Sequence, residues 1–232
     1  MKQETNIEDV RNITKGLIRV VPLRCDNQFG LVQHPFTNMQ IAYLGDGNMV
    51  DLKTEDGFDR WAKHMDDQID RSDLRRIYML VGTAWKLTWL KFIKPYLNLH
   101  DFSELLADCW TAEENPNMDA NVSISTAIKW FKEADKQVLM SDEEYEYWKN
   151  IPKEITLYRG VSPKRKPFGL SWTDNEETAK WFQGRFATGN NKGKLLKVVA
   201  KKEHCLCYLN GRGEEEFVLN VSAVKKEIVE IQ

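Results

Sequence analysis

An arginine, a hydroxyl pair and a carboxylate pair follow one another in the last third of the chain, each on a strand-like segment. The first segment is Leu157-Tyr158-Arg159, followed by Gly160, which lets the backbone turn freely. A guanidinium offers a planar fork of donors that matches phosphate oxygens, so Arg159 could hold a pyrophosphate. Taken alone, an arginine in this place is more often a surface residue at the end of a strand.

The second segment, Ser171-Trp172-Thr173, alternates hydroxyl and aromatic side chains. Because side chains alternate along a strand, both hydroxyls are expected on one face and Trp172 on the other. The hydroxyls could tie neighbouring strands and a carboxylate into place while Trp172 packs in the core. As isolated residues they indicate only a strand.

The third segment brings three acids, Glu214, Glu215 and Glu216, directly into an apolar strand that starts at Phe217. The two-residue period predicts Glu214 and Glu216 on one face and Glu215 on the other. Like charges this close cost electrostatic energy. Such a pair is therefore either fully solvated or functional.

Read in order, the three segments resemble the R-S-E signature of mono-ADP-ribosyltransferases over about residues 154–232. The resemblance implies that NAD is the co-substrate, that Arg159 contacts its phosphates and that Ser171 braces the site around the nicotinamide ribose. It implies that Glu216 is the catalytic glutamate, stabilising an oxocarbenium-like transition state as nicotinamide departs. Glu214 would orient and help deprotonate an acceptor, preferably an arginine.

The resemblance also assigns roles to neighbouring residues. Trp172 and Thr173 would lie at the NAD site, with stacking of Trp172 on nicotinamide left open, and Arg185 would be a second phosphate contact. Loop 187–193 would correspond to the phosphate-nicotinamide loop, and the turn at 209–213 to the target-recognition turn.

Three features depart from the family pattern, and one is Trp172, which stands where the family usually has Thr. Only 11 residues separate Arg159 from Ser171, so a helix usual there is missing or the NAD pocket is reduced. Glu215 flanks Glu214, so the assignment of the two glutamate roles could shift by one residue.

The elements around these segments predict an α+β protein. Residues 17–50 alternate apolar runs with turn signals such as Asp46-Gly47, which predicts a β-ribbon whose first strand is 17–21. From Thr54 onward the apolar residues recur with helical periodicity. One long helix is expected from 74 to 93, before Pro95. Further helices are expected at 101–111 and 123–139, and a short one is expected to start at an N-cap on Ser141.

After Pro152 the pattern becomes β with a single helix. Strands are expected at 155–159, 171–173, 194–200, 204–209, 215–221 and 226–231. Asp174 with Glu177 indicates a capping box that opens the helix. We therefore expect an N-terminal β-ribbon and helical lobe over 1–152, and an ADP-ribosyltransferase-like antiparallel β-sandwich core with one internal helix over 153–232. Asn115, Asn117 and Asp119 of the lobe could reach the cleft, although Asn-Pro-Asn is an ordinary turn sequence.

The charge composition of the chain bears on the classes of partner that it can bind. The formal net charge of -2 gives no global attraction to nucleic acid or an anionic membrane, and the clusters Lys164-Arg165-Lys166 and Lys201-Lys202 are interpreted as solvated charges.

The chain contains no GxxxxGK[ST], GxGxxG or GxSxG motif. The N-terminus lacks the apolar region of a signal peptide and no run of about 18 apolar residues occurs, so a cytoplasmic protein is expected.

The cysteines and histidines do not indicate a metal. The chain has four cysteines (Cys25, Cys109, Cys205 and Cys207) and four histidines, without zinc-binding spacing. The cysteines are interpreted as half-buried, and the pair Cys205 and Cys207 as strand residues. No metal is expected.

Three hypotheses follow. The leading one is a bacterial or phage effector that transfers ADP-ribose from NAD to a protein acceptor of unknown identity. The second keeps the same site but uses water as acceptor, which makes an NAD glycohydrolase. The third is a non-catalytic binding protein on an ADP-ribosyltransferase-like scaffold.

Overall fold

The computed structural model describes residues 4–26, 31–45, 47–188 and 193–231. The chain divides into two compact units. Unit 1 is Met1–Asn98 with Ala112–Glu114, and unit 2 is Leu99–Thr111 with Asn115–Gln232. The boundary expected between 152 and 153 falls inside unit 2, because α8 (Asp142–Asn150) packs against β9 (Cys205–Leu209) of the following sheet.

Unit 1 begins with a helix where a strand was expected. Helix α1 spans Ile7–Val20 and therefore contains most of the segment 17–21. The side chain of Asn6 caps it by accepting a hydrogen bond from the amide of Asp9. Val10, Thr14, Leu17 and Ile18 are buried at helical spacing, so the short apolar run is the end of a helical stripe.

Short antiparallel strands follow α1 in unit 1. They are β1 (Arg24–Asp26), β2 (Leu31–His34), β3 (Thr37–Met39), β4 (Ile41–Tyr43) and β5 (Met49–Asp51). They form a three-stranded sheet, β1-β2-β3, and a hairpin, β4-β5. The expected β-ribbon is therefore present from Arg24 onward. Asp46 of the expected turn lies outside the described residues, and Gly47 has a φ of 76°.

The long helix expected over 74–93 is divided. After α2 (Glu55–Asp70) come α3 (Leu74–Leu80), a 3-10 turn η1 (Thr83–Trp85), α4 (Lys86–Ile93) and η2 (Lys94–Tyr96). Val81 is extended, and the amide of Gly82 donates to the carbonyl of Pro35 at 2.7 Å. The break occurs because this amide bonds outside the helix.

Unit 2 starts with helices and continues as a sheet. Its helices before the sheet are α5 (Leu99–Ala112), η3 (Pro116–Met118), α6 (Ile124–Glu133), α7 (Lys136–Leu139) and α8. The segment 123–139 is two helices, because Ala134 is extended and Asp135 caps α7. The N-cap expected at Ser141 is confirmed, and Ser141 and Glu144 form a capping box.

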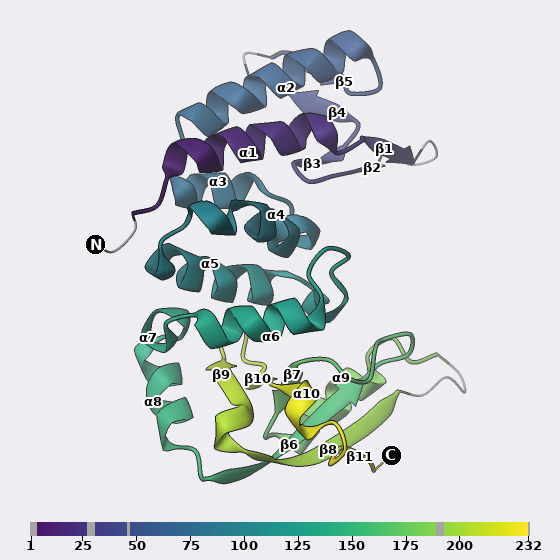
Figure 1. Cartoon of the computed structure of the whole chain (residues 1–232). Helices are drawn as coiled ribbons and strands as arrows, with labels where there is room; N and C mark the ends of the chain where they lie inside the picture. The colour runs from purple at the N-terminus through teal and green to yellow at the C-terminus, as the bar shows by residue number, and fades with distance from the viewer. Residues whose placement is uncertain (1–3, 27–30, 46, 189–192, 232) are drawn as a thin grey trace. The chain divides into compact units, whose positions relative to one another are not determined.

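One antiparallel sheet of six strands forms the rest of unit 2, in the order β11-β8-β6-β7-β10-β9. Its strands are β6 (Glu154–Val161), β7 (Ser171–Thr173), β8 (Lys194–Lys201), β9, β10 (Glu216–Leu219) and β11 (Val229–Glu230). The fold of the described residues is therefore α+β, as expected, but these strands form one sheet where two packed sheets were expected. Helix α9 (Glu176–Gly184) packs on β6, β7 and β8, while α6 and α8 pack on β9 (Figure 1). Helices thus cover these strands in place of a second sheet.

Two local details of unit 2 differ from expectation. Helix α9 is capped by Asn175, whose side chain accepts from the amides of Glu177 and Thr178, and Asp174 instead accepts from the Tyr147 hydroxyl at 2.5 Å. The strand expected over 215–221 is limited to β10. Glu215 has a φ of 51° that ends the strand on one side, and helix α10 (Val221–Val224) follows on the other.

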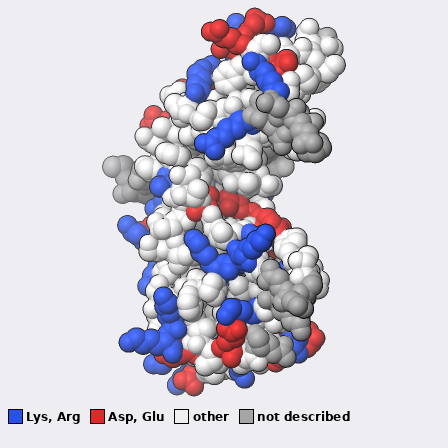
Figure 2. Space-filling view, turned by 90° about the vertical axis from the view of Figure 1, so that its right-hand side faces the viewer, with Lys and Arg blue, Asp and Glu red and all other residues white. Residues whose placement is uncertain are grey.

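Charged side chains of both signs lie on the face shown in Figure 2, and neither sign covers it. This mixture agrees with the net charge of -2. In the described part of the chain, no helix combines the length and the apolar character needed to cross a membrane.

The close approach of α9 to β6 generates a stability prediction. A Cβ at Gly160 would lie 1.8 Å from the carbonyl oxygen of Ala179 and 2.5 Å from the amide nitrogen of Gln183. Because both atoms are backbone, Gly160→Ala must separate helix and strand, and we expect a loss of about 2 kcal/mol or more in unfolding free energy. Gly184→Ala is the control, since nothing lies within 4 Å of its Cβ position. Denaturant unfolding of both variants measures the difference, and equal stabilities would contradict the predicted clash.

Candidate active site

The arginine, serine and glutamate of the predicted signature lie on three neighbouring strands. Arg159 is on β6, Ser171 starts β7 and Glu216 starts β10, and the strand order is β6-β7-β10. Thr173 of the middle strand pairs with Tyr158 on one side and with Glu216 on the other. The fold thus brings the three segments together.

Glu216 is a half-buried carboxylate with two side-chain donors. The indole Nε1 of Trp110 donates to its Oε1 at 2.8 Å, and the Ser171 side chain also hydrogen-bonds to it. Burial is the largest influence on the Glu216 carboxyl and raises its pKa. The negative charge of Glu214 also raises this pKa, whereas the hydrogen bonds from Ser171 and Trp110 and the positive charge of Arg159 lower it. When ionised, such a group is a negative charge in a low-dielectric site, where it acts strongly on nearby positive charge.

Trp110 was not among the residues expected at the site. It comes from α5, is 1% exposed and packs edge-on against Phe131 with ring centroids 5.0 Å apart. It lies 106 residues before Glu216 in the chain, so no local pattern connects the two. A buried tryptophan needs a partner for its N–H, and that requirement is the one sequence signal that could have been used.

Asn117, expected only as a side chain that could reach the cleft, holds the serine. Its Nδ2 donates to the Ser171 hydroxyl at 2.9 Å, and its Oδ1 accepts from the amide of Leu170 at 2.5 Å. The residue lies in η3 and is 7% exposed. Asn117 therefore fixes the start of β7 and orients the hydroxyl that contacts Glu216.

Arg159 is buried, and carbonyl oxygens use much of its guanidinium. Nε donates to Pro167 at 3.1 Å, Nη1 to Ser171 at 2.6 Å and Nη2 to Lys166 at 3.3 Å. Three of its five N–H donors are thus committed to the backbone from Lys166 to Ser171, the first residue of β7. Burial lowers the pKa of Arg159 to about 10, so the group stays charged at neutral pH, with Glu216 favouring that charge. In this structure Arg159 positions the short segment before β7.

Trp172 and Thr173 belong to the packed interior. Trp172 is 2% exposed and its Nε1 donates to the carbonyl of Gly169 at 2.9 Å. This burial leaves no ring face for a nicotinamide, so the stacking left open in the sequence is not supported. Thr173 is 5% exposed and its hydroxyl accepts from the amide of Asn175. Both residues therefore support the site without reaching its surface.

The three glutamates point to different partners. Glu214 forms an ion pair with Arg212 at 3.1 Å, and Arg212 also donates to the carbonyl of Thr111. Glu215, with its positive φ, accepts from Asn175 at 2.8 Å and from Thr178 at 3.3 Å. The regular alternation expected for the three acids is therefore broken at Glu215, although Glu214 still acts electrostatically on Glu216.

Arg185 follows α9 and lies over aromatic rings. Its guanidinium carbon is 5.2 Å from the ring centre of Trp181 and 5.0 Å from that of Phe186, and both rings are exposed. Of the expected phosphate-nicotinamide loop, residues 189–192 lie outside the described residues.

The described cysteine side chains are less accessible than the half-buried positions expected. Cys109 is buried in α5, and Cys205 and Cys207 are buried in β9, while the side chain of Cys25 lies outside the described part. Burial raises the pKa of Cys205 to about 12 and also raises that of Cys207, so neither is a reactive thiolate. Among the described residues, no group of His, Cys, Asp and Glu is arranged to hold a metal ion.

Comparisons with protein-family models, with curated proteins and with solved structures give no match for this chain.

The raised pKa of Glu216 leads to a pH-dependent stability prediction. A raised folded-state pKa means that the folded protein binds the proton more tightly than the unfolded chain, whose Glu pKa is about 4.3. The stabilisation from Glu216 is therefore complete below about pH 4.3 and is lost as pH rises through the folded-state pKa. Glu216→Gln removes this charge while keeping an acceptor for Trp110, so we expect its melting temperature to exceed that of the wild type at pH 7 and the difference to shrink toward pH 4.

Thermal melts across this pH range make the measurement. Glu227→Gln is the control, because Glu227 is exposed and lies outside the site and its variant should melt like the wild type at every pH. A Glu216→Gln protein that melts below the wild type at pH 7 would show that its charge stabilises the fold.

Proposed function

We propose that the chain is an NAD-dependent mono-ADP-ribosyltransferase, with NAD as co-substrate and a protein side chain as acceptor. The observation that carries the proposal is the Glu216 carboxylate, half-buried beside Arg159 and hydrogen-bonded by Trp110 and Ser171. Cleavage of the bond between nicotinamide and ribose develops positive charge on the ribose ring. A preorganised, desolvated carboxylate stabilises that charge without reorganisation when the bond breaks.

The residues around Glu216 would share the remaining tasks. Ser171, held by Asn117, keeps the carboxylate oriented. Arg159 fixes the backbone before β7 and has two further donors beyond the three bonds described, which we propose face the NAD phosphates. Arg185, beside two exposed rings, would be a second phosphate contact. Trp110 and Asn117 lie before residue 153, so the proposed catalytic core also needs α5 and η3.

The environment of Glu214 supports arginine as the acceptor class. A guanidinium, that of Arg212, already lies 3.1 Å from this carboxylate. An acceptor arginine would take the place of Arg212, and Glu214 would orient it and help remove its proton. Arg212 is in the turn between β9 and β10, where Gly213 has a φ of 69°, so the turn has the backbone freedom for such an exchange.

The first test is NAD turnover by the full chain. Glu216→Gln should lower the rate of nicotinamide release by about 100-fold or more, because the charge that stabilises the transition state is lost. Glu214→Gln should keep most of the NAD cleavage but lose transfer to protein. Glu215→Gln is the matched control, and a loss of cleavage in this variant alone would assign the catalytic role to Glu215.

Labelled NAD incubated with cell extract separates the remaining hypotheses. A labelled protein band that disappears in Glu216→Gln supports transfer. Free ADP-ribose without labelled protein would identify an NAD glycohydrolase. If the wild type neither consumes NAD nor gains thermal stability from it, a non-catalytic binding protein replaces both enzymes.

A further inference from the structure

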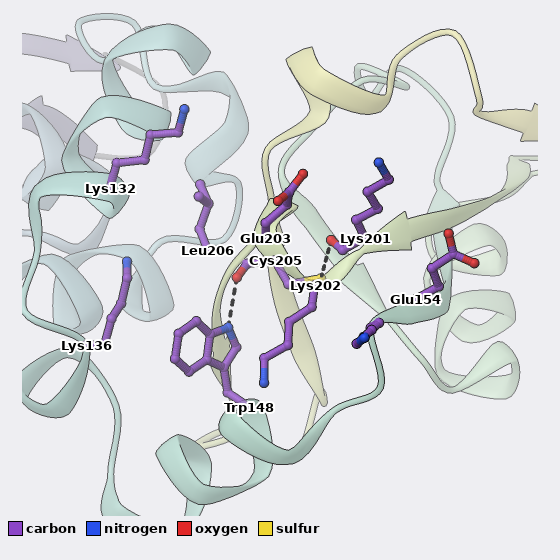
Figure 3. A pocket seen from close by; sticks show the side chains of 10 residues that line it. Lys132, Lys136, Trp148, Glu154, Lys201, Lys202, Glu203, Cys205 and Leu206 are labelled. Atoms are coloured by element: carbon purple, nitrogen blue, oxygen red, sulfur yellow. Dashed lines mark hydrogen bonds between the residues drawn. The ribbon is translucent and has the colours of Figure 1, made fainter.

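A groove of about 740 Å³ lies in unit 2, and none of the residues that line it belongs to the signature (Figure 3). Its lining combines five lysines with two glutamates, a tryptophan and two apolar residues. They are Lys132, Lys136, Trp148, Lys153, Glu154, Lys201, Lys202, Glu203, Cys205 and Leu206. Lys132 and Lys136 come from the side of α6 and α7, whereas Lys201 and Lys202 come from the end of β8 and η4 (Lys202–His204), with Trp148 and Leu206 between them. Positive charge therefore enters the groove from opposite sides.

The lysines of this groove are not neutralised by ion pairs among the described residues. Lys136 donates to the carbonyl of Phe131, and Lys202 donates to the carbonyl of Lys149. A carbonyl oxygen is a neutral acceptor and adds no negative charge beside either lysine, while burial lowers the pKa of Lys136. The two glutamates leave a net charge of +3, from five lysines and two acids, in a protein whose total is -2.

The apolar part of the lining is fixed. Trp148 donates through Nε1 to the carbonyl of Cys205 at 2.8 Å, and the Lys202 ammonium lies 5.8 Å from its ring centre. Leu206 is 5% exposed and Cys205 2% exposed, in a strand that is buried at every position. The groove therefore has a buried floor with charged lysine side chains around it.

We propose that this groove is a second ligand site, separate from Glu216, and that it binds a small organic or inorganic polyphosphate. A lysine ammonium is a compact, strongly hydrated point charge that binds phosphate oxygens without a fixed fork geometry. Several ammonium groups around one concavity are matched best by a ligand that carries several negative charges in a small volume. The groove volume lies within the range of about 300–1,000 Å³ typical of small-molecule sites.

Polyphosphate fits the groove better than an acidic peptide or a nucleic acid strand. The carboxylates of a peptide on one side of an extended chain are separated by about 7 Å, so few enter one concavity together. A nucleic acid strand needs a basic track that continues along its backbone. The lysines here are gathered around a single concavity and form no such track.

The experiment is calorimetric titration of the full chain with tripolyphosphate and with ATP. We expect both to bind, and binding to weaken as ionic strength rises from about 50 mM to about 300 mM. Lys132→Glu combined with Lys153→Glu should weaken binding about tenfold or more, because two attractions become repulsions. Both side chains are exposed, so the fold should be retained. A higher affinity for ATP than for tripolyphosphate would identify a nucleoside polyphosphate, and equal affinities a free polyphosphate.

The control combines Lys63→Glu with Lys226→Glu, which changes the net charge equally at exposed lysines outside the groove. This variant should bind within about twofold of the wild type. The proposal is overturned if the wild type does not bind tripolyphosphate, if both double variants weaken binding equally, or if only an acidic peptide or single-stranded RNA binds. Nicotinamide release by the groove variant should equal that of the wild type, so failure of the NAD proposal and failure of this one are distinguished.

Discussion

The buried guanidinium of Arg159 is the constraint on which the site geometry rests. A cation removed from water costs several kcal/mol unless hydrogen bonds and an opposite charge compensate it. The carbonyls of Lys166, Pro167 and Ser171 supply the bonds, and the Glu216 carboxylate adds an attraction that offsets the effect of burial only in part. A Cβ at Gly169 would lie 2.4 Å from Nη2 of Arg159, so this segment packs against the guanidinium with no space to spare. The short gap between Arg159 and Ser171 is therefore filled by a backbone that wraps the arginine.

The strands that carry the site were predictable, because local patterns specify them. Strands at 155–159 and 171–173 were expected from β-forming residues, and β6 and β7 lie there. The contacts that complete the site were not predictable in the same way. Trp110 and Asn117 reach Glu216 and Ser171 from 106 and 54 residues away in the chain, and no periodicity encodes such a distance. The expected alternation of side chains was also wrong at Glu214, Glu215 and Glu216, because the left-handed backbone at Glu215 gives each carboxylate a different partner.

The errors outside the site have separate causes, and the first is that a short apolar run fits both the strand and the helix period. The segment 17–21 satisfies a strand pattern over five residues, but it completes a helical stripe that begins at Val10. The break near Gly82 depends on a bond to Pro35 from a distant part of unit 1. The expectation of two packed sheets rested only on the resemblance to mono-ADP-ribosyltransferases. That expectation did not specify which helices would pack on the strands. In unit 2 the helices α6, α8 and α9 do so.

Strand β9 connects the two charged regions of unit 2 and keeps their electrostatics distinct. Leu209 at one end pairs with Glu216, and Cys205 and Leu206 at the other end line the lysine groove. Cys207, midway, is buried, and its pKa is influenced by Lys136 in one direction and by Glu216 in the other. At Glu216 burial disfavours the charge and the donors oppose that effect only in part, whereas the exposed Lys132 side chain meets no such burial. The half-buried Glu216 carboxylate and the exposed lysines of the groove therefore lie in different electrostatic environments within the same unit.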